Sequence, residues 1–181
     1  MISLVLKDMT FEQDIRELLM AFYPEEKYIY TYEDSILSLF LSKNDTDYHI
    51  KIKNEENVLE FNSPLRETKF DTKNDLKRNI YLNLLKLGNE KLPWGTLTGI
   101  RPTKIVMEML EKNMAIKDIK KHLKEVYLVS DKRTKLCIDT AKNEFNILKK
   151  VDYKNGYSLY IGIPFCPTRC LYCSFTSYSI A

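Results

Sequence analysis

The chain has 181 residues, of which 44% are hydrophobic and 29% charged, and its formal net charge is +3; these values predict a folded globular protein. No apolar run is long enough to span a bilayer, and the opening Met1–Leu6 is too short, and lacks the basic start, for a signal peptide. We therefore expect a cytoplasmic protein without a membrane span.

The first part of the chain predicts a sheet with one helix. A short strand is expected at residues 2–6, and apolar residues at spacings of three and four predict a helix at Thr10–Phe22 with Thr10 as its N-cap. Strand-like runs follow at Tyr28–Tyr32, Ile36–Leu41, Tyr48–Lys53 and Val58–Phe61. Alternating apolar and polar residues in the third run indicate an antiparallel meander with one face in water.

From Asp71 the pattern becomes helical. An apolar stripe through Leu76, Ile80 and Leu84 predicts a helix that ends at Gly88. After a connection that contains the only Trp, further helices are expected from Pro102 to about Lys112, at Ala115–Tyr127, and at Ser130–Lys150 with Ser130 or Asp131 as cap. The run Tyr157–Ile163 predicts a strand buried on both faces.

The charge is divided unevenly along the chain. Residues 1–100 carry 17 acidic and 13 basic side chains, so the twelve tyrosines are interpreted as core and sheet packing, and no nucleic-acid partner is expected. Residues 101–150 carry 13 basic and 7 acidic side chains, which either favour an anionic ligand or form a solvated lysine face.

The most specific pattern is the spacing of three cysteines. Cys166, Cys170 and Cys173 are spaced C-x3-C-x2-C directly after the last predicted strand. Such clustering favours metal or cluster binding, because a disulfide framework would spread its cysteines to join distant segments. Three thiolates on one loop can hold a four-iron cluster and leave one iron open to a reactant. Structural zinc is the alternative, but it needs a fourth ligand that no motif spacing supplies.

The run from Tyr160 to Phe175 resembles the cluster loop of the radical S-adenosylmethionine family, and more narrowly that of the oxygen-independent coproporphyrinogen III oxidase-like group. In that group a strand of the pattern Tyr-x-x-Ile-Pro-x-Cys leads into the three cysteines, as Tyr160–Cys166 does here. Gly162 and the segment Trp94–Lys104 are most similar to the HemZ-type branch, coproporphyrinogen dehydrogenases that carry an extra N-terminal domain before the catalytic barrel.

The resemblance implies two cofactors. Cys166, Cys170 and Cys173 would hold a 4Fe-4S cluster, and S-adenosyl-L-methionine would bind the open iron. Tyr172 would lie beside the adenine, and Tyr160 and Phe165 are further candidates for cofactor contacts. The implied reaction is hydrogen abstraction by a 5′-deoxyadenosyl radical, which in the oxidase leads to oxidative decarboxylation of coproporphyrinogen III in heme biosynthesis. The implied partners are a porphyrinogen or heme-like small molecule and a cytosolic electron donor, and no catalytic residue is assigned.

Two positions depart from the oxidase pattern. Phe175 stands where the oxidase has a further cysteine, and Gly162 where it has a histidine. The Phe arrangement is shared with heme-chaperone-type relatives, so heme or porphyrin binding without oxidase turnover is an alternative function. A complete barrel needs on the order of 200 residues, so we expect an N-terminal piece that has no turnover alone.

The remaining candidates have ordinary structural interpretations. Cys137 is expected to be a buried apolar side chain, His49 to face solvent, and His122 to lie in a lysine-rich helix. The segment from Trp94 either contacts an anion or substrate through Arg101, Thr103 and Lys104, or is an ordered connection with Trp94 on the core.

The predicted fold class is α+β: an N-terminal antiparallel sheet with helices, then a helical segment, then the first strand and cluster loop of a truncated (β/α) barrel. The predicted domains are residues 1–150, with the helical part at about 71–150, and residues 156–181. A third functional hypothesis treats residues 1–150 as a non-catalytic interaction module.

Overall fold

The computed structural model describes residues 1–152, 155–168, 170–175 and 177–179, and all structural statements below refer to these. The chain forms two units, Met1–Phe145 and Asn146–Ala181, and each is described by itself.

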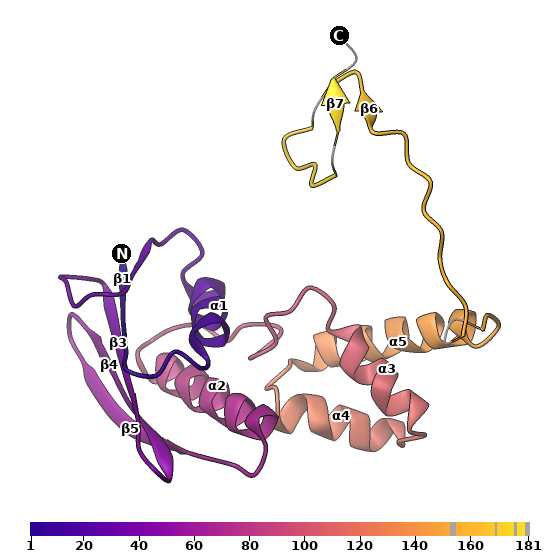
Figure 1. Cartoon of the computed structure of the whole chain (residues 1–181). Coiled ribbons are helices and arrows are strands. Elements are labelled where there is room, and N and C mark those ends of the chain that lie inside the picture. The colour runs from indigo at the N-terminus through magenta and orange to yellow at the C-terminus, as the bar shows by residue number, and fades with distance from the viewer. Residues whose placement is uncertain (153–154, 169, 176, 180–181) are drawn as a thin grey trace. The chain divides into compact units, whose positions relative to one another are not determined.

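The first unit begins with a five-stranded sheet and two helices (Figure 1). The strands are β1 (Ile2–Leu6), β2 (Tyr28–Ile29), β3 (Leu37–Lys43), β4 (Asp47–Asn54) and β5 (Val58–Pro64), in the spatial order β2-β1-β3-β4-β5. The helices are α1 (Glu12–Phe22) and α2 (Lys69–Lys86).

The sheet is mixed, which corrects the prediction of a wholly antiparallel sheet. Strands β3, β4 and β5 form the predicted antiparallel meander, but β1 pairs in parallel with both β2 and β3. The reason is the connection: α1 carries the chain from the end of β1 back to its start, and a strand that follows such a crossover runs parallel. The predicted strand Tyr28–Tyr32 is reduced to two residues.

Helices α1 and α2 cover one face of the sheet and build the main core with it (Figure 1). Ile15 and Leu18 of α1, Ile80 of α2, and Leu39 and Ile50 of the strands are all fully buried. Because side chains alternate along a strand, the neighbours of these strand residues point to the other face. That face carries Phe40 and Lys51, which are partly exposed, and it is the predicted wet face.

Three further helices complete the first unit: α3 (Thr103–Glu111), α4 (Ile116–Glu125) and most of α5 (Asp131–Leu148). Their buried apolar side chains, each at most 2% exposed, are Val106, Ile119, Leu123, Ile138 and Ala141. A sheet with helices in the described residues confirms the predicted α+β class.

The helix ends differ from prediction at one position and match it at two. Thr10 is not the cap of α1, because the cap position is Phe11 without a side-chain bond, and the Thr10 amide instead donates to Asp8 Oδ1 at 2.8 Å. Gly88 follows the end of α2 with a φ of 91°, as a C-terminal glycine should. The Arg133 amide donates to Ser130 Oγ at 3.4 Å, so Ser130 caps α5.

The second unit contains two short strands, β6 (Phe165–Cys166) and β7 (Tyr178–Ser179), which pair in parallel. The predicted strand Tyr157–Ile163 is wrong, because these residues have no regular secondary structure and are exposed throughout. A strand needs a neighbour for its backbone hydrogen bonds, and no described segment pairs with this run. None of the helices in the described residues has the length and apolar character that crossing a membrane requires.

Candidate functional site

The three cysteines lie on one short loop, whose two ends are joined by the pairing of β6 with β7. The Tyr178 amide donates to the Pro164 carbonyl at 2.7 Å, and Cys166 pairs with Ser179 in the ladder. Within this loop, the Cys173 amide donates to the Cys170 carbonyl at 3.0 Å, and this hydrogen bond forms a tight turn. The topology therefore places all three thiols in one loop.

The loop does not gather the thiols into a closed metal site. The described residues contain no group of three or more potential metal ligands. Cys170 is exposed, Cys166 and Cys173 are partly buried, and all three are free thiols. The donor set nevertheless has the chemistry of an iron–sulfur site, since three accessible thiols lie within eight residues and none is used in a disulfide.

The predicted cofactor contacts are also on the surface of this unit. Tyr160 and Tyr172 are 92% and 90% exposed. Phe165 is 54% exposed and packs its ring on Tyr178, with centroids 6.0 Å apart. The structure thus places Phe165 beside the cysteines in β6, and it brings neither tyrosine into a contact that defines a binding site.

In the first unit, the segment around Trp94 is a connection that backbone hydrogen bonds hold in place. Gly95 has a φ of 57°, and a Cβ at this position would lie 2.0 Å from the Tyr127 carbonyl oxygen. The Thr96 amide donates to the same oxygen at 2.8 Å, and the Ser130 amide donates to the Pro93 carbonyl at 3.1 Å. Only glycine allows so close an approach of two backbones in this conformation.

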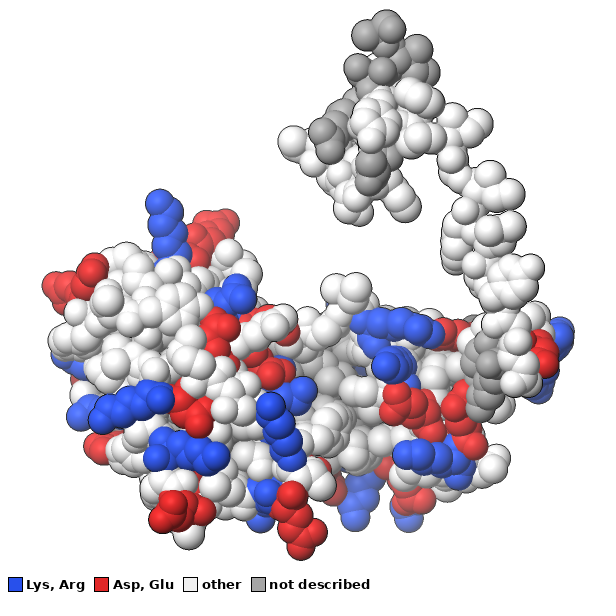
Figure 2. All heavy atoms as spheres, viewed as in Figure 1, with Lys and Arg blue, Asp and Glu red and all other residues white. Residues whose placement is uncertain are grey.

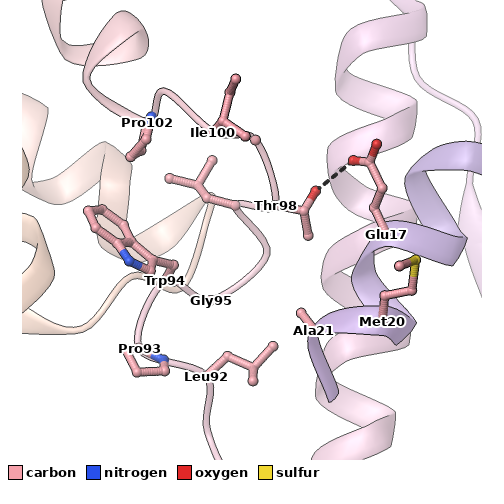
Figure 3. Close-up of a pocket in the computed structure, with 12 residues that line it drawn as sticks. Glu17, Met20, Ala21, Leu92, Pro93, Trp94, Gly95, Thr98, Ile100 and Pro102 are labelled. Carbon is pink, nitrogen blue, oxygen red and sulfur yellow. Dashed lines mark hydrogen bonds between the residues drawn. The ribbon is translucent and has the colours of Figure 1, made fainter. Parts of the chain in front are cut away.

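This connection and helix α1 line an open cavity of about 600 Å³ (Figure 3). Met20 and Ala21 of α1 form one wall, and Leu92, Trp94 and Ile100 of the connection form the other. The Trp94 ring is held by the Arg133 guanidinium, 5.5 Å from the ring centroid. Most of the lining is apolar, as is usual for small-molecule pockets.

Two linked side-chain hydrogen bonds lie at the edge of this cavity. Lys77 Nζ donates to Thr98 Oγ1 at 3.0 Å. The Thr98 hydroxyl in turn donates to Glu17 Oε2 at 3.1 Å (Figure 3). Lys77 is only 7% exposed, and burial lowers the pKa of its ammonium group. These two hydrogen bonds join α2, the connection and α1, three segments that are far apart in sequence.

Sequence reasoning missed Glu17 and Lys77, because each falls within an amphipathic helix pattern where a charged residue is ordinary. The one available clue was the position of Lys77 directly after Leu76, on the buried side of α2. Of the proposed anion contacts, Arg101 pairs with Glu144, and Lys104 lies 4.0 Å from Glu108. These pairs favour the interpretation as an ordered connection.

The isolated thiol and the two histidines have structural surroundings. Cys137 is 1% exposed, and burial raises the pKa of its thiol. The rings of His122 and Tyr127 pack edge-on with centroids 5.5 Å apart, and burial lowers the pKa of His122. His49 Nε2 lies 2.8 Å from Glu60 Oε1, with 44% of its side chain exposed.

Comparison with known proteins gives one informative match. The chain is 33% identical over 188 residues to the "Oxygen-independent coproporphyrinogen-III oxidase-like protein HemZ" of Bacillus subtilis (strain 168). The match covers 96% of this chain and 37% of the relative, so the chain spans a little over a third of that protein's length. No family profile and no solved structure matches the chain.

Proposed function

We propose that this chain is the N-terminal part of a radical S-adenosylmethionine oxidoreductase of the coproporphyrinogen dehydrogenase type. The observation that carries the proposal is the coincidence of two features: a relative similar over 96% of the chain, and the C-x3-C-x2-C spacing of Cys166, Cys170 and Cys173. The relative's name refers to oxidase-like chemistry on coproporphyrinogen III, which we take as the proposed substrate of the whole protein.

In this proposal, Cys166, Cys170 and Cys173 hold a 4Fe-4S cluster. The cluster and S-adenosylmethionine, when bound, supply the radical that removes hydrogen from the substrate. The chain's own residues contribute three thiolates, an exposed aromatic Tyr172 for the adenine, and a loop whose base is fixed by the β6–β7 pair. Phe165 lies at that base, where its ring packs on Tyr178.

The first unit is proposed as an accessory domain. It has its own core and places none of the three clustered cysteines, so it contributes no ligand to the cluster. Its cavity beside Trp94 and its open sheet face leave room for contacts with a substrate or with the rest of a longer protein. Alone, the chain is expected to bind a cluster but not to turn over.

The cluster is tested on the chain itself. After anaerobic reconstitution with iron and sulfide, we expect iron and sulfide in the ratio of a four-iron cluster and a charge-transfer absorption that dithionite bleaches. Replacing Cys166, Cys170 and Cys173 by Ser should abolish both, whereas Cys137→Ser is the matched control and should change neither. If the chain instead binds zinc at these cysteines and the loop keeps the same structure, the proposal of an iron–sulfur cluster is contradicted.

The reaction is tested on a protein that carries this chain at the length of its relative. With reductant, S-adenosylmethionine and coproporphyrinogen III, the proposal predicts 5′-deoxyadenosine and a decarboxylated porphyrinogen by mass spectrometry. Deoxyadenosine without the decarboxylated product would remove the proposed substrate and favour heme or porphyrin handling, the alternative that Phe175 suggests. If neither product forms with an intact cluster, radical chemistry is excluded under these conditions and residues 1–150 are better treated as an interaction module.

A further inference from the structure

The face of the sheet that α1 and α2 leave uncovered carries a basic hollow. A cavity of about 500 Å³ lies over β1, β3 and β4, within the size range of small-molecule pockets. Its lining includes Lys7, Lys51 and Lys53, and none of the described residues that line it is Asp or Glu. In the space-filling view, Lys and Arg side chains lie over the strands of the sheet, with Asp and Glu side chains among them and uncharged surface between (Figure 2).

The positive charge of this hollow is only partly compensated. Glu60 is the acidic residue opposite Lys51 in the β4–β5 register, and its carboxylate lies 2.8 Å from His49 Nε2. Lys53 Nζ donates to the Tyr32 hydroxyl at 3.4 Å, a neutral partner that leaves its charge in place. Three lysines around one cavity therefore favour an anionic ligand.

Between the lysines the surface is aromatic and apolar. The rings of Tyr32 and Phe40 lie 5.4 Å apart at an angle of 41°, and Tyr32 is 60% exposed. Val58 is 53% exposed at the rim. Such a surface gives the flat face of an aromatic ligand a place to pack, while the lysine side chains reach groups at its edge.

We propose that this hollow, formed by Lys7, Lys51, Lys53, Tyr32 and Phe40, binds a tetrapyrrole that carries carboxylates on its edge. The ring would pack on Tyr32 and Phe40, and the lysines would pair with the carboxylates. The choice of a tetrapyrrole rests on the proposed function. A single-stranded nucleic acid fits less well, since residues 1–100 carry 17 acidic against 13 basic side chains, which repel a long polyanion.

The test is a titration of the 181-residue chain with coproporphyrin III, followed by the shift of its absorption band and by its fluorescence. Neutralising the hollow with Lys7→Gln, Lys51→Gln and Lys53→Gln together should weaken binding about tenfold or more, and added salt should weaken wild-type binding. The matched control neutralises three exposed lysines of the helical part, Lys112→Gln, Lys117→Gln and Lys132→Gln, and should bind as the wild type does.

The aromatic surface is tested at Tyr32, whose exposure makes substitution safe for folding. Tyr32→Ala should weaken binding several-fold and Tyr32→Phe should not, because the ring and not the hydroxyl contacts the ligand. Unfolding curves of all variants check that the fold is retained.

The outcomes separate this proposal from the proposed function. Equal affinity of the hollow and control variants would overturn it, as would displacement of coproporphyrin III by a single-stranded oligonucleotide at similar concentration. A chain with Cys166, Cys170 and Cys173 replaced by Ser should bind as the wild type does. If that variant alone loses binding, the tetrapyrrole site lies at the cysteine loop, and the hollow is excluded while the proposed function stands.

Discussion

The two units of the chain differ in where their apolar side chains lie. In Met1–Phe145, Leu39, Ile50 and Ile80 have no exposed surface. In Asn146–Ala181, Ile161 and Tyr172 are 88% and 90% exposed. The first unit therefore stabilises its fold by burial within itself, whereas the described residues of the second carry the three cysteines on an exposed loop and bury little apolar surface. A unit with so little burial depends on a bound metal or on further contacts for its stability.

The largest expected effect is on the reactivity of the thiols. Cys137 is 1% exposed with a pKa raised by burial, whereas Cys170 is exposed. Alkylation of Cys137 requires opening of the first unit, so it should be about a thousandfold slower than that of Cys170. Mass spectrometry of the native chain after iodoacetamide treatment measures both. Rates within tenfold of each other would mean that the first unit opens as readily as the second.

The next effect compares one isoleucine in each unit. Ile50→Ala removes a fully buried side chain from the core and should lower the free energy of unfolding by about 3 kcal/mol. Ile161→Ala changes a side chain that is 88% exposed and should cost less than about 0.5 kcal/mol. Urea unfolding followed by circular dichroism measures the difference. Similar losses would show that the run 157–163 is packed in solution.

A third effect tests the connection around Trp94. In Gly95→Ala the new methyl group would lie 2.0 Å from the Tyr127 carbonyl oxygen at a φ of 57°, so we expect a loss of about 2 kcal/mol or more. Gly99→Ala is the matched control, because nothing lies within 4 Å of a Cβ at that position. Thermal unfolding distinguishes the two, and equal stability of both variants would argue against the close approach of the two backbones.

Periodicity predicted most of the first unit, because its elements bury one face each. The alternation at Tyr48–Lys53 and the stripe through Leu76, Ile80 and Leu84 correspond to β4 and α2. It could not predict that β1 pairs in parallel with β3, since strand direction depends on how the helix between them crosses the sheet.

Prediction failed where a pattern depends on a partner outside the segment. The run Tyr157–Ile163 has the composition of a buried strand, but composition does not supply the neighbouring strand. The cysteine spacing was evident in the sequence, and the cavity beside Trp94 was not, because it arises from the packing of α1 against a distant connection.

The smallest effect concerns Lys77, which joins α1, α2 and the connection through Thr98 and Glu17. Burial lowers its pKa from the ordinary 10.5, against the attraction of Asp14 and Glu17. Between the lowered pKa and 10.5, the folded chain loses this proton while the unfolded chain keeps it, so this group makes stability rise with pH in that window. Below the window the buried charge reduces stability by a constant amount.

Lys77→Met should therefore remove this rise of stability with pH. The difference in unfolding free energy between wild type and Lys77→Met should grow in favour of the wild type as the pH approaches 10.5. Tyrosine titration acts in the opposite direction, since burial raises the pKa of Tyr28 to about 12, but it is common to both proteins and cancels in the difference. Lys86→Met, on an exposed position of the same helix, should keep the wild-type profile. If the difference in unfolding free energy between wild type and Lys77→Met does not change with pH in this range, water reaches Lys77. The first unit would then be more open to solvent around Lys77 than in its core.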